Sequence, residues 1–278
     1  MKPTIIVNKF YTKHAVILVI QFLLVIFVLS FFADVLSVII GISLLEEVMV
    51  IGLFQLLSVT ILLAVKYDQI GADVLFQLKQ IPRDFTLVIW LMILAVGDLI
   101  LMSEIHNVFK MVVPGLFFES RIANAILFET SFLIRVVVLV LFPSLCEEVL
   151  FRGVIANRLA QNYSEVRAVI LSAVLFGISH LSLGQIIPAF LGGLLYGFVY
   201  LRTRNIFYSI LLHFFYNLAI IISYEVPIKI GNFNVVNNDP GRQPWWFTAI
   251  GITLLIFGLV QVMGRSSTCS CDQSDYTV

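Results

Sequence analysis

The sequence predicts an all-α protein, a polytopic membrane helix bundle of about eight transmembrane helices. Of its 278 residues, 60% are hydrophobic and only 12% are charged, whereas about a quarter of the residues of an average soluble domain are charged. The mean hydropathy of +1.03 is too high for a protein whose whole surface faces water. The apolar residues also form long runs, and a helix needs about 20 such residues to cross a bilayer.

The apolar runs place the predicted spans along the chain. They lie near residues 15–43, 48–65, 85–103, 123–150, 167–182, 186–201, 205–224 and 245–263. The first run is too long for the apolar part of a secretory signal, so we interpret it as an uncleaved helix. We divide the chain into N-terminal transmembrane helices (1–122), a core on the fourth to seventh helices (123–224), an outer loop with the last helix (225–263) and a disordered cytoplasmic tail (264–278). Gly193 and Gly197 form a small-xxx-small pair that favours close helix packing.

The basic residues indicate the orientation of the bundle. With the N-terminus inside, the inner segments carry twelve Lys and Arg residues, and the outer segments carry four, Lys110, Arg121, Lys229 and Arg242. Positive charge favours the cytoplasmic side. We therefore predict a multi-pass integral membrane protein with both termini in the cytoplasm. The net charge of zero gives no field that would attract nucleic acid.

Three polar clusters interrupt the apolar background of the fourth, fifth and seventh spans. They are Glu147-Glu148-Val149-Leu150-Phe151-Arg152-Gly153, Phe176-Gly177-Ile178-Ser179-His180 and His213-Phe214-Phe215-Tyr216-Asn217. Polar and ionisable groups are costly inside a membrane, so such residues are candidates for function.

Helical spacing predicts what each cluster can do. Glu148 and Arg152 are four residues apart, so they share a face and can pair. Glu147 points about 100° away from Glu148, which leaves one carboxylate free for another task. His213 and Asn217 are also four apart. If the bundle brings these groups to His180, they can deprotonate a water and stabilise an oxyanion.

Each cluster alone also has an ordinary structural interpretation. The glutamates can be interfacial charges, His180 can be a helix-end histidine bonded to a backbone carbonyl, and His213 with Asn217 can hydrogen bond neighbouring helices. Their joint occurrence within one stretch of the chain favours a shared site. Asp98 and Arg135 we interpret as structural, paired with each other or with Glu129.

The clusters, in this order, resemble the CPBP family of intramembrane proteases. This family includes the CAAX prenyl proteases, the lysostaphin-resistance-A-like proteins and the abortive-infection proteins. Its pattern is Glu-Glu-x-x-x-Arg, then Phe-x-x-x-His, then His-x-x-x-Asn or Asp, and this sequence supplies every position over roughly residues 140–220. The resemblance implies an intramembrane endopeptidase with its catalytic core on the fourth to seventh helices.

The resemblance also implies a role for each residue. Glu147 and His180 would activate the attacking water, His213 and Asn217 would stabilise the oxyanion or hold a metal, and Glu148 with Arg152 would shape the site. A catalytic zinc held by Glu147, His180 and His213 stays open. So does metal-free catalysis with Glu147 as the base, since the sequence contains no His-Glu-x-x-His.

The implied partners are the lipid bilayer and a peptide or protein substrate, which the sequence does not identify as lipidated or not. Two other classes of function stay open. A proton-coupled transporter would use buried Glu, His and Asp98 as a relay, but we find none of the inverted repeats that many transporters contain. A non-catalytic immunity or partner-binding protein would have kept the fold without the reaction.

Overall fold

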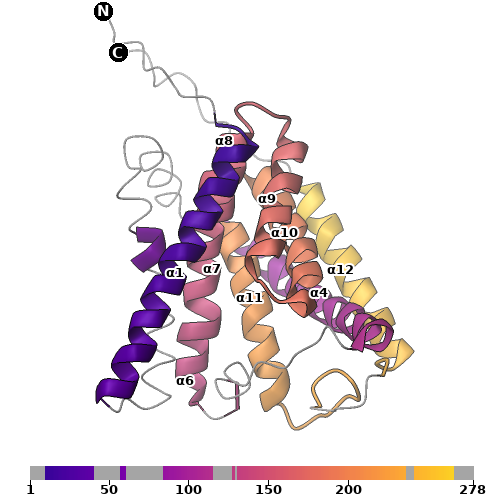
Figure 1. The fold of residues 1–278 in the computed structure, drawn as a ribbon. Coiled ribbons are helices and arrows are strands. Elements are labelled where there is room, and N and C mark those ends of the chain that lie inside the picture. The colour runs from indigo at the N-terminus through magenta and orange to yellow at the C-terminus, as the bar shows by residue number, and fades with distance from the viewer. Residues whose placement is uncertain are drawn as a thin grey trace, which may run out of the picture.

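The computed structural model describes residues 10–40, 57–60, 84–114, 127–128, 130–235 and 241–265, and in these ranges every regular element is a helix. The named helices are α1 (Thr12–Ile40), α4 (Phe85–Val112), α6 (Phe132–Arg135), η3 (Val136–Leu141), α7 (Phe142–Glu148), η4 (Val149–Ala156), α8 (Asn157–Leu159), α9 (Glu165–Ser179), α10 (Leu183–Thr203), α11 (Ile206–Glu225) and α12 (Trp245–Gly264). The prediction of an all-α membrane bundle is confirmed (Figure 1).

Five helices within the described residues are long and apolar enough to cross a membrane, and α4 is the longest of these spans at 28 residues. The chain from α6 to α8 forms one further long helix, and α9 has 15 residues. Each predicted span contains helix where its residues are described, although Thr130, Ser131, His180–Ser182 and Asn205, which were predicted to lie within spans, are not helical. The span predicted at 48–65 lies outside the described residues except for 57–60, which are helical. The four-part division of the chain stays a prediction.

Polar residues at the loop junctions determine where several helices begin and end. Asp84 caps α4 by accepting a hydrogen bond from the N–H of Leu87 at 3.0 Å, and Asn205 caps α11 through the N–H of Phe207 at 2.9 Å. Arg265, just after α12, pairs with Asp84 and so ties the ends of α4 and α12 together. Burial raises the pKa of Asp84, but the hydrogen bonds from Arg265 and Leu87 outweigh it and hold that pKa below its ordinary value.

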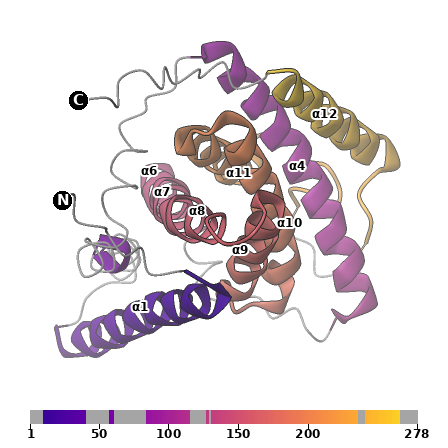
Figure 2. The same ribbon diagram turned by 90° about the horizontal axis from the view of Figure 1, so that it is seen from above.

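Small residues allow the helices to approach closely. A Cβ at Gly197 would lie 2.5 Å from Val169, and one at Gly193 would lie 3.2 Å from Ala173, so the predicted glycine pair brings α10 against α9. Gly97 approaches the backbone of α12 in the same way. Seen from above, α4 and α12 lie side by side along one flank of α10 and α11, and α1 lies beyond α9 on the other flank (Figure 2).

One predicted pairing is wrong. The guanidinium of Arg135 forms an ion pair with Glu225 at the end of α11, at 2.6 Å, and donates to the carbonyl of Leu127 at 2.8 Å. Asp98 lies on α4 and does not pair with Arg135. Glu129, the other predicted partner, lies outside the described residues. The pairing follows from the packing of the long α6–α8 helix against α11, which sequence spacing does not reveal.

Candidate active site

The two glutamates lie at the C-terminal end of α7, between two π-helical stretches. Residues Val136–Leu141 and Val149–Ala156 form η3 and η4, and the α-helical turns of α7 separate them. π-Helical turns are uncommon and occur often at functional sites, because the extra residue displaces the following side chains from the regular α-helical spacing. Here η4 begins directly after Glu148 and carries Arg152 into the interior.

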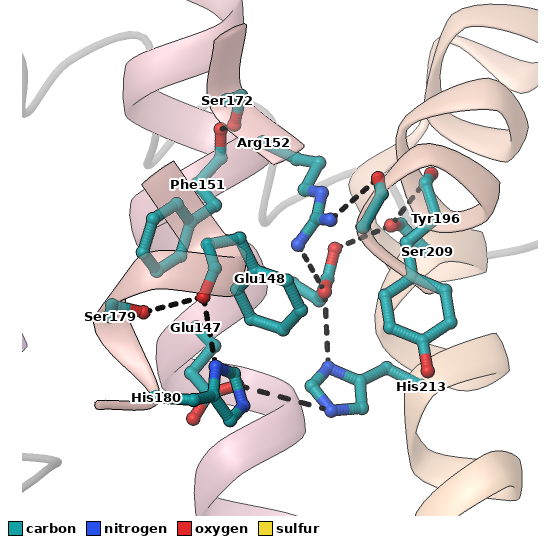
Figure 3. A network of polar contacts seen from close by, with 12 residues as sticks. Glu147, Glu148, Phe151, Arg152, Ser172, Ser179, His180, Tyr196, Ser209 and His213 are labelled. Carbon is teal, nitrogen blue, oxygen red and sulfur yellow. Dashed lines mark hydrogen bonds and ion pairs between the residues drawn. The ribbon is translucent and has the colours of Figure 1, made fainter. Parts of the chain in front are cut away.

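Glu148 is the centre of a buried hydrogen-bond network. Its side chain is 0% exposed. One carboxylate oxygen, Oε1, accepts from Arg152 at 2.7 Å and lies 3.1 Å from Nδ1 of His213. The other, Oε2, accepts from the hydroxyl of Ser209 at 2.6 Å. Buried carboxylates need such partners to offset their lost hydration, and Glu148 has them on both oxygens (Figure 3).

Arg152 joins three helices at this point. Besides Glu148, it donates to the carbonyl of Gly193 on α10 at 2.8 Å. Its guanidinium lies 4.7 Å from the ring centroid of Phe176 on α9 and 5.4 Å from that of Tyr196 on α10, both at cation–π distance. A side chain at Gly193 would meet Phe176 at 3.1 Å. The absence of a side chain at Gly193 therefore lets α10 pack closely against the Phe176 ring, while the Gly193 carbonyl accepts from Arg152.

His213 on α11 lies between the two glutamates. Nδ1 faces Glu148, whereas Nε2 is 4.0 Å from Oε2 of Glu147. The imidazole stacks on Tyr196 with 4.8 Å between centroids and an interplanar angle of 19°, and Phe176 contacts it edge-on at 6.0 Å. The Glu147 side chain is 16% exposed and makes no hydrogen bond to a described residue, in contrast to Glu148.

His180 is the residue that ends α9. Its Nδ1 is 2.8 Å from the carbonyl of Phe176, so it does form the bond of a helix-end histidine. The same bond fixes the ring 4.9 Å from the Phe176 ring, the ring that His213 also contacts. With Nδ1 donating to the carbonyl, Nε2 of a neutral His180 is an acceptor. Figure 3 draws His180 on the Glu147 side of the cluster.

Asn217 is placed differently from the other five candidates. It is partly buried, one turn beyond His213 on α11, but it makes no hydrogen bond to Glu147, Glu148, His180 or His213. The structure therefore brings Glu148, Arg152 and His213 into one network with Glu147 beside it. It places His180 against the shared Phe176 ring and leaves Asn217 outside the hydrogen bonds.

Residues 129–219, about a third of the chain, match the family model of Rce1-like proteins, described as type II CAAX prenyl endopeptidase Rce1-like. Over these residues the chain is similar to the Rce1-like family, and we call residues 129–219 the Rce1-like domain. The match confirms the resemblance to intramembrane CAAX proteases and supports a peptidase role in general. No curated protein and no solved structure matches the chain. The long apolar helices make this an integral membrane protein.

Sequence reasoning missed two residues of the Rce1-like domain that hold the cluster together. Ser209 donates to Glu148 and also lies 3.0 Å from the carbonyl of Tyr196, and Tyr196 forms one wall of the His213 site. Ser209 precedes His213 by four residues and so lies on the same face of α11. That spacing was a usable signal. Tyr196 has no motif of its own, because only the α10–α11 packing brings it to His213.

A catalytic zinc needs three protein ligands arranged around one position. Within the described residues, no group of three or more His, Cys, Asp and Glu side chains is arranged to hold a metal ion. The side chains of Glu147, His180 and His213 are each of a type that zinc accepts, but as placed they do not form a ligand set. We therefore derive no catalytic step through a metal.

Proposed function

We propose that the Rce1-like domain is an intramembrane endopeptidase that hydrolyses a peptide bond near the membrane surface with water activated by Glu147 and His180. The observation that supports this most is the unequal environment of two adjacent glutamates. Glu148 is fully buried and bonded on both oxygens, whereas Glu147 is partly exposed, is not hydrogen bonded to a described residue and faces Nε2 of His213 at 4.0 Å.

This difference assigns the two carboxylates different tasks. Glu148 is 0% exposed and is surrounded by Arg152, His213 and Ser209, so an attacking water does not reach it without displacing a partner. Glu148 acts instead as a positioning group for His213, as carboxylates do for catalytic histidines. The carboxylate of Glu147 has free acceptor capacity. The 4.0 Å between its Oε2 and Nε2 of His213 leaves no room for a peptide between the two atoms, but both atoms can contact one water or one developing oxyanion. Glu147 is therefore the general base of the proposal.

The charges of the cluster support a donor role for His213. Glu147 and Glu148 carry two negative charges when ionised and Arg152 carries one positive charge. When both ring nitrogens of His213 carry a proton, Nδ1–H donates to Glu148 and Nε2–H is available to the oxygen of a scissile carbonyl. Asn217, one turn further along α11, would supply a second donor once substrate is bound.

The proposed reaction begins with the attack of water on the scissile carbonyl. Glu147, assisted by His180, accepts a proton from water, and the water oxygen bonds to the carbonyl carbon of the substrate. The oxyanion that forms is held by His213 and Asn217. The intermediate then collapses, the carbon–nitrogen bond breaks, and the proton taken up by the base is transferred to the leaving amine. As placed among the described residues, Glu147, His180 and His213 do not form a zinc ligand set, so every step is assigned to side chains, and chelation of the purified protein tests that assignment.

The family description names CAAX prenyl endopeptidases, so a farnesylated CAAX peptide is the first substrate to test. The experiment compares it with the same peptide lacking the lipid, using detergent-purified full-length protein and mass spectrometry of the products. Cleavage in wild type and its loss in Glu147→Ala would support the proposal. Glu225→Ala is the matched control, because Glu225 is 48% exposed and pairs with Arg135 at the far end of α11.

Two results would contradict this assignment. Full cleavage by Glu147→Ala would remove Glu147 from the mechanism, and no cleavage of any peptide by wild type under conditions where the protein is folded would remove the peptidase function. A parallel assay after exhaustive chelation, with metal content measured, separates metal-free from metal-dependent catalysis. Activity that is lost when stoichiometric zinc is removed and that returns when zinc is added back would show a metalloprotease.

A further inference from the structure

Asp98 is a buried acid that the proposed reaction does not use. Asp98 lies near the middle of α4 and is only 2% exposed, and its Oδ2 has no hydrogen-bond partner among the described residues. Gly97, the preceding residue, faces α12, and α4 packs against α10 and α11 as well as α12. An unpaired carboxyl oxygen inside a membrane protein is costly, so such a group retains a partner that is a polar side chain or a bound water.

Two tyrosines connect Asp98 with the candidate active site. Helix α4, which carries Asp98, packs against α10 and α11, which carry Tyr196 and Tyr216, and Asp98 lies within electrostatic range of both tyrosines. The two rings contact each other edge-on at 6.5 Å. Neither hydroxyl makes a hydrogen bond within the described part of the chain. The Tyr196 ring also stacks on His213 with 4.8 Å between centroids. The two tyrosines therefore lie between Asp98 on α4 and the imidazole of His213.

We propose that Asp98, Tyr196 and Tyr216 form a hydrated polar pocket, in which Asp98 binds water bridged to the tyrosine hydroxyls and thereby positions the Tyr196 ring against His213. The pocket satisfies three polar groups that otherwise have no partner in the described structure. It also keeps water inside the bundle, next to a site whose reaction consumes water. Buried waters of this kind typically make about three hydrogen bonds, which matches one carboxyl oxygen and two hydroxyls.

Asp98 is therefore a positioning residue and not a catalytic one. The predicted effect of Asp98 on turnover rests on the proposed peptidase function. The predicted water in the pocket does not depend on that function. An apolar residue of similar size would remove the acceptor and expel the water, and Tyr196 would lose the bond that orients it. An asparagine would keep both the shape and the hydrogen bonding. The two replacements therefore separate the role of the polar group from the role of its volume.

The first experiment measures the water directly. Radiolytic hydroxyl-radical labelling with mass spectrometry modifies side chains that lie beside bound water. Tyr196, which is buried, and Tyr216, which is partly buried, should both be labelled in wild type, and Asp98→Leu should lower the labelling of both several-fold. Tyr208, buried and accepting a hydrogen bond from the N–H of Asp84 at 3.0 Å, is the internal control and should not change.

Unlabelled Tyr196 and Tyr216 in wild type would overturn the proposal, and this result needs no variant, so it decides the question even if Asp98→Leu does not fold. Labelling that is the same in folded Asp98→Leu and in wild type would overturn it as well. If the tyrosines are labelled but no peptide is cleaved, the pocket stands and the peptidase function fails.

The second experiment measures the effect on turnover. Asp98→Leu should lower kcat by about tenfold to a hundredfold, the range for residues that orient a ligand or a catalytic group, with KM unchanged. Asp98→Asn should restore most of the rate. Tyr196→Phe should act like Asp98→Leu, and the double variant should lose no more than either single one, because both act through one network.

Glu104→Gln is the matched control on α4. Glu104 is a second buried acid on this helix, but it accepts its hydrogen bonds from Arg242 and from the N–H of Gln243 and none from His213, Tyr196 or Tyr216, so its variant should keep wild-type kcat. Additive losses for Asp98→Leu and Tyr196→Phe, or an asparagine variant as slow as the leucine variant, would refute the positioning role.

Discussion

Removing the charge of Glu148 should destabilise the protein more than removing both members of its ion pair. Glu148 and Arg152 have side chains that are 0% and 1% exposed. In Glu148→Leu the guanidinium keeps one acceptor, the carbonyl of Gly193, and its charge is left uncompensated inside the bundle. Breaking a buried pair in this way costs about 3–5 kcal/mol, so we expect a loss of that size in the free energy of unfolding.

The double variant Glu148→Leu/Arg152→Met removes the uncompensated charge. Apolar residues of similar volume often replace a buried ion pair at little cost. The variant still loses the bond to the carbonyl of Gly193, a loss of about 1 kcal/mol. The double variant should therefore lie about 1–2 kcal/mol below wild type, with a coupling energy of about 2 kcal/mol or more between the two sites.

The assay is equilibrium unfolding in mixed detergent micelles, followed by tryptophan fluorescence. The matched control is the surface pair Glu165 and Arg204, which are joined at 2.6 Å but are 47% and 52% exposed. Exposed pairs contribute about 0–1 kcal/mol, so Glu165→Leu/Arg204→Met should show almost no coupling. A double variant in the core that is as unstable as Glu148→Leu would refute the reasoning, and so would a cost below about 1 kcal/mol for the single change.

The same pair of variants separates stability from catalysis. The double variant regains most of its stability but not the acceptor for Nδ1 of His213, which only Glu148 provides among the described residues. Loss of such an orienting group typically lowers activity about tenfold to a hundredfold. A stable double variant with full peptidase activity would show that Glu148 does not position His213.

Three further predictions follow from the fold and the site. Glu147→Ala and His180→Ala should each lower peptide cleavage by about 10²–10⁴-fold without changing folding, measured as kcat alongside gel filtration in detergent; retained turnover excludes that residue. Gly197→Ala should destabilise the protein by about 1–3 kcal/mol because its Cβ would lie 2.5 Å from Val169, and Val169→Ala should restore the loss; no rescue would contradict the contact. Ile228→Cys, at a position 71% exposed after α11, should react with an impermeant thiol reagent from outside intact cells, in a variant without the native cysteines; labelling only after permeabilisation would invert the topology.

The helices could be predicted from the sequence because the bilayer imposes a simple requirement. A span needs a run of about 20 apolar residues, and such runs are directly visible in the chain. The prediction was least accurate where length was the only criterion: α4 runs on to Val112 because nothing in its sequence ends the helix at residue 103. The long helix from Phe132 continues to Leu159 through the polar cluster, past the predicted end at residue 150.

The network of the site could be predicted in part. The i,i+4 spacing of Glu148 and Arg152 correctly predicted their pairing, because both residues lie on one continuous helix. The contact between His213 and Glu148 spans 65 residues and depends on how α11 packs against α7. Local spacing carries no information on that packing. For the same reason the Arg135–Glu225 pair was missed, and the role of Tyr196 became visible only with α10 in place.

The geometry of an imidazole explains why neighbouring glutamates can take different tasks here. Glu147 and Glu148 diverge by about 100° around α7, so a single side chain opposite them can meet both only if it has polar atoms on two edges. His213 has them: Nδ1 reaches the buried Glu148 and Nε2 faces the more open Glu147. With Arg152 and Ser209 also bonded to Glu148, the charge that orients the histidine is already satisfied. The remaining carboxylate then lies at the more open edge of the cluster, where an acceptor with free capacity can meet a water.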